Sequence, residues 1–262
     1  MRILFIGDLV GSPGRQVLQS ELDRLVDQHK ADLIIANVEN AAGGFGVTPE
    51  IARETLSLGV HCLTSGNHIW DRREIIPFLD EEPRLLRPLN YPPPVPGYGT
   101  WIGETAAGIR VGVVNLMGRV FMPPLLCPFG TADDAVKKLR EHTRIVLVDF
   151  HAEATSEKIA MGWHLDGRVT AVVGTHTHVQ TADARVLPSG TACITDVGMT
   201  GSHDGIIGID RKLAMKRFLT QRPVRFTPAN GNVRLKAVLI DVDEATGRSL
   251  SITRLSAPEE NL

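Results

Sequence analysis

Carboxylate, amide and imidazole side chains follow five apolar segments at the points where these segments end. If the segments are parallel strands of an open α/β sheet, their carboxyl ends lie along one edge, where such sheets bind ligands. We therefore expect groups that are scattered in the sequence to meet in space. In chain order the groups are Asp8, then Glu39 and Asn40, then Asn67 and His68, then His151, and finally His176 and His178.

Several of these residues also have an ordinary structural explanation. Asp8 and Asn40 each precede residues typical of turns, and taken alone Asp8 is better explained as a turn or capping carboxylate. Glu39 is harder to explain in this way. Burying a carboxylate at the end of an apolar strand costs free energy unless a cation or a hydrogen-bond donor pairs with it. His176 and His178 are two residues apart in a short loop, so both rings can face one cation or two adjacent cations.

Imidazoles, carboxylates and amide oxygens together indicate the class of metal. No cysteine is placed to join them, which argues against a structural zinc site. The mixed nitrogen and oxygen set suits iron, manganese, zinc or cobalt better than calcium or magnesium. The candidates are too many for one ion. We therefore expect two transition-metal ions, bridged by a carboxylate and about 3.5–4 Å apart.

The elements that must position these residues alternate between strand and helix in the first 65 residues. Ser12 and Pro13 look like an N-cap and a first turn, and Thr48 with Pro49 opens a second helix. This order predicts a parallel sheet with right-handed crossovers. The expected strands are 3–6, 33–38, 60–64, 109–115, 145–150, 169–173, 191–195, 233–242 and 250–255.

The chain is expected to form one domain over residues 1–262. Residues 83–99 are rich in proline and predict an extended excursion without regular structure. In the last third, strands predominate and only one helix is expected, near residues 210–219. We expect these late strands to form a second, mixed or antiparallel sheet that covers the other side of the molecule.

Composition excludes several classes of protein. The 262 residues have a formal net charge of −2, which gives no sign of a dedicated nucleic-acid-binding surface or of membrane-surface binding. No apolar run approaches the roughly 20 residues of a spanning helix. Three scattered cysteines, Cys62, Cys127 and Cys193, exclude a disulfide framework and favour the cytoplasm, and each is expected to be a small buried apolar residue.

The order of these motifs resembles that of the calcineurin-like metallophosphoesterases, and in its details the YmdB-like branch of bacterial phosphodiesterases. The similarity spans nearly the whole chain. The resemblance implies a layered αββα fold, with central mixed sheets flanked by helices and an active site at the carboxyl ends of the strands. The motifs that carry it are Gly7-Asp8-Leu9-Val10-Gly11, Val38-Glu39-Asn40, the stretch from Ser65 to Asp71, the stretch from Gly174 to Gln180, and the stretch from Asp196 to Gly201.

The resemblance also assigns the metal ligands and the metal. Glu39 would bridge the two ions, and iron would be bound, with manganese or zinc as alternatives. The first site departs from the wider superfamily, whose usual Asp-x-His is Asp8-Leu9-Val10 here. The longer Glu39 also replaces the usual bridging Asp. The remaining ligands would be Asp8, Asn40 and His178 for the first ion, and Asn67, His151 and His176 for the second.

The function implied is hydrolysis of 2′,3′-cyclic nucleotides, of 3′,5′-cyclic nucleotides as a further class, and of simple phosphodiesters. A metal-bridging hydroxide would attack phosphorus in line, and His68 would protonate the leaving group as general acid. Arg119 and His203 are candidate substrate contacts, and an ordinary surface salt bridge explains Arg119 equally well. Assembly into a homo-oligomer is implied by the resemblance alone.

Three other functions remain open from the sequence. A phosphomonoesterase or a nuclease could use the same metal centre. A signalling or scaffold protein could keep the metal site without catalysis, although the intact Asn67-His68 pair argues against it. A dinucleotide-binding domain is the weakest alternative, because the glycines at 7, 11 and 14 lack the required G-x-G-x-x-G spacing.

Overall fold

Two sheets form the centre of the fold. The structure is a computed structural model that describes residues 1–258. The first sheet has the strand order β2-β11-β12-β1-β3-β4, and β13 pairs with β12. Its strands β1, β3 and β4 run parallel, as the alternation of strands and helices predicts. The strands of this sheet are β1 (Arg2–Ile6), β2 (Asp8–Leu9), β3 (Leu33–Asn37), β4 (Cys62–Thr64), β11 (Met199–Ser202), β12 (Val233–Val242) and β13 (Ser249–Ala257).

The second sheet is built from the middle of the chain. Its order is β5-β6-β7-β8-β10-β9, and β6, β7, β8 and β10 run parallel. Only its two edge strands pair antiparallel to their neighbours. The strands are β5 (Thr100–Glu104), β6 (Arg110–Met117), β7 (Ile145–His151), β8 (Ala171–Thr175), β9 (Arg185–Val186) and β10 (Ala192–Ile194).

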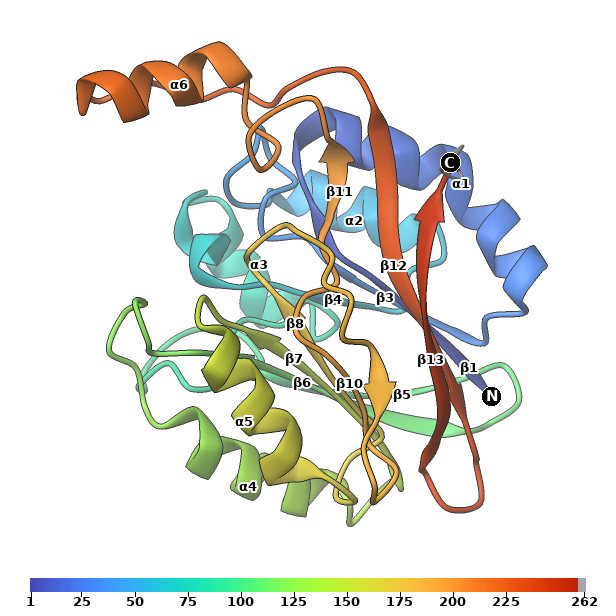
Figure 1. The fold of residues 1–262 in the computed structure, drawn as a ribbon. Helices are drawn as coiled ribbons and strands as arrows, with labels where there is room; N and C mark the ends of the chain where they lie inside the picture. Colours follow the sequence, from blue (N-terminus) through green and yellow to red (C-terminus); the bar gives the residue numbers. More distant parts are fainter. Residues whose placement is uncertain (259–262) are drawn as a thin grey trace.

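Helices cover the outer face of each sheet, which gives four layers (Figure 1). Helices α1, α2 and α3 pack on the first sheet, and α4 and α5 pack on the second. Helix α6 projects from the body. The predicted αββα arrangement is confirmed. The helices are α1 (Gly11–His29), α2 (Pro49–Ser57), the 3-10 helix η1 (Asn67–Trp70), α3 (Ile75–Glu81), α4 (Pro128–Leu139), α5 (Thr155–Leu165) and α6 (Arg211–Thr220).

The apolar runs of the parallel strands follow from burial on both faces. In β1, Ile3 and Phe5 face the second sheet, whereas Leu4 and Ile6 face the helices. Successive side chains of a strand point to opposite faces, so a strand between two packed layers must be apolar throughout. The core between the sheets and the two cores under the helices hold the carboxyl ends of the strands in fixed positions.

The expected place of the C-terminal strands is wrong. We expected them to form a second sheet. Strand β10, at the expected 191–195, does lie in the second sheet, but β12 and β13 extend the first sheet, and β12 pairs antiparallel with β1. The second sheet comes instead from residues 100–194. Alternating polarity shows that a strand exists but carries little information about its partner, because pairing across long sequence separations depends on the whole core.

The expected start of α1 is also wrong. The helix begins at Gly11 after Val10, and Ser12 lies inside its first turn. Gly11 has φ of 61°, a left-handed conformation that favours glycine, and its backbone N–H donates to the carbonyl oxygen of Asn40 at 2.9 Å. The tight turn therefore replaces a side-chain cap. At α2 the predicted cap is confirmed, since the Thr48 side chain accepts a hydrogen bond from the backbone of Ile51.

Residues 83–99 contain no helix and no strand, as expected. Leu85 still forms an isolated bridge with Leu63 of β4, which attaches the excursion to the first sheet, and Leu86 forms one with Tyr98 inside the excursion. The single domain over 1–262 stays a prediction. Among residues 1–258, no helix combines the length and apolar character needed to cross a membrane.

The three cysteines are free. Cys62 is buried as expected, and Cys193 is partly buried. The expectation for Cys127 is wrong, because its side chain is exposed at the start of α4.

Candidate metal centre and pocket

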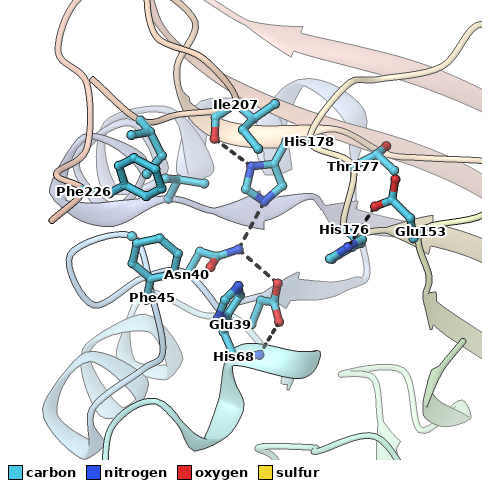
Figure 2. A pocket seen from close by; sticks show the side chains of 13 residues that line it. Glu39, Asn40, Phe45, His68, Glu153, His176, Thr177, His178, Ile207 and Phe226 are labelled. Atoms are coloured by element: carbon cyan, nitrogen blue, oxygen red, sulfur yellow. Dashed lines mark hydrogen bonds and ion pairs between the residues drawn. The ribbon is translucent and has the colours of Figure 1, made fainter. Parts of the chain in front are cut away.

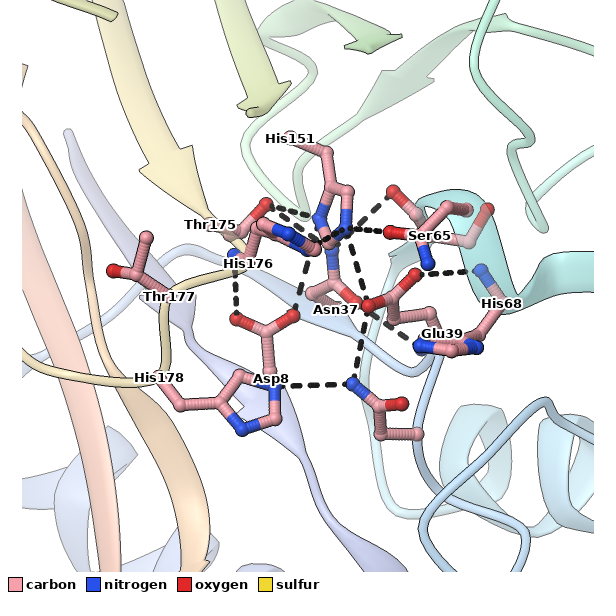
Figure 3. Close-up of polar contacts among 12 residues, drawn as sticks. Asp8, Asn37, Glu39, Ser65, His68, His151, Thr175, His176, Thr177 and His178 are labelled. Atoms are coloured by element: carbon pink, nitrogen blue, oxygen red, sulfur yellow. Dashed lines mark hydrogen bonds and ion pairs between the residues drawn. The ribbon is translucent and has the colours of Figure 1, made fainter. Parts of the chain in front are cut away.

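The predicted metal ligands meet at the strand ends (Figure 3). Strand β2 begins at Asp8, and β7 ends at His151. The loop after β3 supplies Glu39 and Asn40, η1 begins at Asn67, and the loop after β8 supplies two histidines. The sequence predicted this convergence from the common edge of parallel strands. The seven residues brought together are Asp8, Glu39, Asn40, Asn67, His151, His176 and His178.

Glu39 lies at the centre of the cluster and is almost fully buried. Its Oε1 lies 3.1 Å from His151 Nε2 and accepts a hydrogen bond from Asn40 Nδ2 at 3.1 Å. Its Oε2 accepts from the backbone N–H of His68 at 3.0 Å. Two groups of ligand atoms share this carboxylate. One contains Glu39, His151 and His176, and the other contains Asp8, Glu39 and His178.

The first group has more ligand atoms than hydrogen bonds can satisfy. His151 Nε2 lies 3.1 Å from Glu39 Oε1, 3.0 Å from Asn67 Oδ1 and 3.0 Å from His176 Nδ1. A ring nitrogen carries one hydrogen or one lone pair, so it can satisfy only one of these contacts. Two imidazole nitrogens and two oxygens converging in this way fit the coordination shell of one cation.

The second group contains a buried oxygen without a partner. Asp8 is fully buried, and its Oδ1 has no hydrogen-bond partner among the described residues. Its Oδ2 accepts from the backbone N–H of His176 at 3.3 Å. Burying such an oxygen without a hydrogen bond costs several kcal/mol, and the nearest ring nitrogen, His151 Nδ1, is 4.0 Å away. The donor set of Asp8, Glu39 and His178 therefore also fits a metal ion.

Asn40 lies between His178 and Glu39, two members of the second group. Its amide nitrogen faces His178 Nε2 at 3.2 Å and Glu39 Oε1 at 3.1 Å. Rotation of the amide by half a turn would place its oxygen toward the same space, since the two ends are nearly identical in shape. Asn40 can therefore serve as the predicted additional ligand in the turned orientation.

Burial and mutual charge shift the pKa values of the cluster. Burial raises the pKa of Asp8 well above its usual range. Burial alone would raise the pKa of Glu39, but His151 lowers it to about 2. For His151, burial is outweighed by Glu39 and Asp8, which raise its pKa to about 9. Burial lowers the pKa of His178, and burial with the charge on His151 lowers that of His176 to about 3. Both rings are thus neutral, as a metal ligand requires.

Residues behind the cluster orient its imidazoles. His151 Nδ1 lies 2.9 Å from Thr175 Oγ1, which in turn donates to Asp149 at 2.8 Å. His178 Nδ1 lies 2.9 Å from the carbonyl oxygen of Ile207, to which it donates. In His178 this leaves Nε2 with a lone pair that faces the cluster, the arrangement usual for metal-binding histidines. His151, whose pKa of about 9 keeps both ring nitrogens protonated, would release the proton on Nε2 when it binds a cation.

A buried ion pair fixes the loop that carries His176 and His178. Both residues have positive φ, of 102° and 66°, so the loop needs support from outside. Asp196 supplies it, because its carboxylate accepts from the backbone N–H and the hydroxyl of Thr177 and pairs with Lys158 Nζ at 2.7 Å. Lys158 and Asp196 are both almost fully buried.

We expect Lys158→Met to lower the free energy of unfolding by about 3–5 kcal/mol, because it leaves the Asp196 carboxylate buried without its counter-charge. Chemical denaturation measures the change. The control is the double variant Lys158→Met/Asp196→Asn, which removes both charges and should be more stable than the single variant. A decrease below about 1 kcal/mol in the single variant would contradict this role for the pair.

An open pocket of about 400 Å³ lies beside the cluster (Figure 2). His68 lines it, and His68 Nδ1 lies 2.8 Å from Asp71 Oδ2. Within residues 1–258 no hydrogen-bond partner is found for Nε2 of this ring. The remaining lining residues are Val10, Glu39, Asn40, Gly44, Phe45, Glu153, His176, Thr177, His178, Ile207, Ile209 and Phe226.

Arg119 and His203 do not line this pocket. Arg119 is exposed after β6, and its backbone N–H donates to Glu157 at 3.0 Å. His203 is partly buried after β11, and its backbone N–H donates to the carbonyl oxygen of Asn232. Their role as substrate contacts therefore stays a prediction, without support from the pocket geometry.

Sequence reasoning missed several residues of the site. Asp71 ends the motif that starts at Ser65, and its place three residues after His68 on a helical turn was the available signal. Glu153, two residues after His151, lies 3.1 Å from His176 Nε2. Phe226 reaches the pocket from a segment far along the chain, and no local signal marks it.

The fold and the site together define an α/β protein with two candidate metal-ligand groups at the common edge of its strands, beside an open pocket. The chain belongs to the YmdB-like protein family, whose model matches residues 4–255.

Relatives of known name agree with this membership. The chain is 50% identical over 263 residues to a protein of Bacillus subtilis (strain 168) named 2′,3′-cyclic-nucleotide 2′-phosphodiesterase, with 100% of this chain and 99% of the relative covered. It is 32% identical to a putative phosphatase/phosphodiesterase of Mycoplasma genitalium, over 97% of this chain and 92% of the relative.

Solved structures share the fold over nearly the whole chain. A hypothetical protein from Thermus thermophilus superposes with a TM-score of 0.92 at 44% identity, and 98% of each chain is covered. A structure described as a novel phosphatase from Mycoplasma pneumoniae has a TM-score of 0.91 at 31% identity, covering 98% of this chain and 92% of that chain.

Proposed function

We propose that this chain is a metal-dependent phosphodiesterase of the metallophosphoesterase superfamily. The observation that carries the proposal is the pair of ligand groups that share Glu39 and border the pocket containing His68. That the chain is a phosphoric diester hydrolase agrees with the names of its relatives. A carboxylate shared by two cation sites beside an open pocket is the arrangement expected for hydrolysis of a phosphate ester.

Two transition-metal ions per chain would be held by these groups. Asp8, Glu39, Asn40 and His178 would hold the first, and the nitrogens and oxygens around His151 would hold the second together with Glu39. This donor set suits iron, with manganese or zinc as alternatives. When bound, such ions stabilise negative charge on phosphoryl oxygens and make water a competent nucleophile near neutral pH.

The chain's own residues perform the remaining tasks. The buried cluster closes one side of the pocket, so a phosphodiester can approach only from the open side. His68 holds a proton on Nε2 at the pocket and delivers it to the departing alkoxide, a step worth about 10²–10⁴-fold for a poor leaving group. Asp71 holds the opposite nitrogen and so fixes the orientation of the ring.

The substrate class follows from the name of the Bacillus subtilis relative. That protein is named for 2′,3′-cyclic nucleotides and for cleavage on the 2′ side. We propose that this chain likewise hydrolyses 2′,3′-cyclic nucleotides, and that 3′,5′-cyclic nucleotides and simple phosphodiesters are further substrates. For a 2′,3′-cyclic nucleotide, water adds to phosphorus, the bond to O2′ breaks, O2′ takes the proton, and a 3′-phosphate remains.

The test compares a diester with its monoester. Protein loaded with iron or manganese is assayed on 2′,3′-cyclic AMP, on bis-p-nitrophenyl phosphate and on p-nitrophenyl phosphate, and the nucleotide product is identified by ³¹P NMR. We expect turnover of both diesters and a 3′-phosphate product from the nucleotide. Faster turnover of the monoester would favour a phosphomonoesterase, and turnover of none would refute an enzymatic role.

Asp71→Asn should lower kcat by about 10–10²-fold, with KM and metal content unchanged. The amide keeps the shape of the side chain but no longer offers a charged acceptor to His68 Nδ1, and the ring contacts no ligand group through Nδ1. Steady-state kinetics on an alkyl phosphodiester measure the effect. Asp71→Glu is the conservative control and should recover part of kcat. A rise in KM alone would show that Asp71 acts on binding.

A further inference from the structure

Residues 211–225 form a strongly basic excursion that projects from the body (Figure 1). Helix α6 and the segment after it contain six cationic side chains and no carboxylate, in a chain whose formal net charge is −2. We call residues 211–225 the basic arm. Its cations are Arg211, Lys212, Lys216, Arg217, Arg222 and Arg225.

Fold stability does not account for these cations. All six are exposed, and none forms an ion pair within residues 1–258. Arg211 and Lys212 occupy the first turn of α6, where the helix dipole disfavours positive charge. Ala214 is the one buried residue of α6, whereas Phe218 and Leu219 are 65% and 77% exposed. The arm is thus accessible to a partner.

The basic arm begins and ends at the pocket. Ile209 and Phe226, which flank it in the sequence, both line the pocket. At its base, the backbone N–H of Asp210 donates to the carbonyl oxygen of Thr227 at 2.9 Å, and Ile209 pairs with Pro228. A molecule whose reactive end occupies the pocket would therefore extend directly along the arm.

Two aromatic rings face each other at the same rim (Figure 2). The rings of Phe45 and Phe226 are stacked, with centroids 6.5 Å apart and planes inclined by 19°. Phe45 also contacts the ring of His68, with centroids 5.0 Å apart. Aromatic faces bind nucleobases by stacking, and a track of cations beside them is typical of single-stranded nucleic-acid binding.

We propose that this site acts on RNA strands that end in a 2′,3′-cyclic phosphate, and that the basic arm binds the phosphates upstream of that end. The proposal rests on the proposed function, whose reaction it leaves unchanged. The terminal base would lie against Phe45 and Phe226. Helix α6, with ten residues and a length of about 15 Å, would follow about three or four phosphates.

Charge and position favour RNA over other partners of the arm. An anionic membrane or an acidic face of a second copy could also meet exposed cations, but neither explains why the arm starts at a pocket for phosphate esters.

An RNA-binding arm differs from our expectation that the chain has no dedicated nucleic-acid-binding surface. That expectation used the net charge of the whole chain, in which the arm is offset by carboxylates elsewhere.

The test compares two substrates with the same reactive end. The kcat/KM of metal-loaded protein is measured on 2′,3′-cyclic AMP and on an RNA of about eight nucleotides ending in 2′,3′-cyclic AMP, long enough to reach along the arm. The arm variant is Lys212→Gln/Lys216→Gln, and the matched control is Lys137→Gln/Lys138→Gln, which removes two exposed lysines from α4. Each assay is repeated over a range of salt concentrations.

We expect wild type to prefer the RNA by about tenfold or more at low salt, and the arm variant to lose most of this preference while its turnover of 2′,3′-cyclic AMP stays unchanged. The slope of log kcat/KM for RNA against log salt should become shallower by about 1.4, because each phosphate that is no longer neutralised by a lysine changes the slope by about 0.7. The control variant should behave like wild type.

Other outcomes separate the two proposals. Turnover of the mononucleotide without preference for RNA, or an equal decrease in the control variant, would overturn the role of the arm alone. No turnover of either substrate would refute the proposed function as well. A third outcome is that wild type shows no preference for RNA, whereas the arm variant changes the sedimentation coefficient or the binding to anionic vesicles. The arm would then bind another copy of the chain or a membrane, and the inference would be wrong.

Discussion

Glu39→Ala is expected to reduce the metal content from two ions per chain to nearly none and to abolish phosphodiesterase activity. Glu39 belongs to both ligand groups and is the carboxylate that two adjacent cations would share. Two unit charges about 4 Å apart repel by about 4 kcal/mol in a protein site. The proposed ions carry at least two charges each, so their mutual repulsion is larger than this and, without the carboxylate, weakens binding by more than about 10³-fold.

The measurement is elemental analysis of purified variant and wild type, with circular dichroism to confirm that both are folded. Glu39→Gln is the second variant, because it keeps the volume of the side chain and removes only its charge. Glu50→Ala, an exposed carboxylate on α2, is the matched control and should keep both ions. A folded Glu39→Ala protein that still holds two ions would refute the bridging role.

His68→Ala is expected to keep both metal ions but to lose about 10²–10⁴-fold in kcat on substrates with alkoxide leaving groups. The ring lines the pocket and belongs to neither ligand group, so its removal eliminates the proton donor and leaves the candidate ligands in place. A p-nitrophenyl leaving group needs no protonation, so bis-p-nitrophenyl phosphate should be hydrolysed at nearly the wild-type rate.

The ratio of the two kcat values is the readout, since a general loss of structure would lower both equally. Phe45→Leu, which changes the neighbouring ring without removing a proton donor, serves as the control. Full activity of His68→Ala against an alkyl phosphodiester would eliminate His68 as general acid.

The residues of the strand-end cluster could be predicted from the sequence because each lies at or just after the end of a strand. Asp8, Glu39 and His151 are far apart in the chain, but strand direction alone brings them to one edge. The apolar runs of the strands indicated burial on both sides, whereas the four layers were implied by the family resemblance. These features depend on local patterns, which a sequence carries in full.

Other features depend on pairings that no local pattern specifies. The addition of β12 to β1 joins the two ends of the chain, and nothing near residue 233 indicates that partner. Phe226 reaches Phe45 only because the basic arm returns to the pocket rim. The cationic character of the arm was visible in the sequence, but a charge averaged over 262 residues concealed it.

The strand-end cluster is expected to hold two metal ions. Mass spectrometric analysis of metal content per chain, on protein purified without chelators and without a nickel column, tests it most directly. We expect about two equivalents of iron, manganese or zinc per chain. A protein that contains no transition metal and takes up none when metal is added would contradict the proposed centre and the phosphodiesterase activity that depends on it.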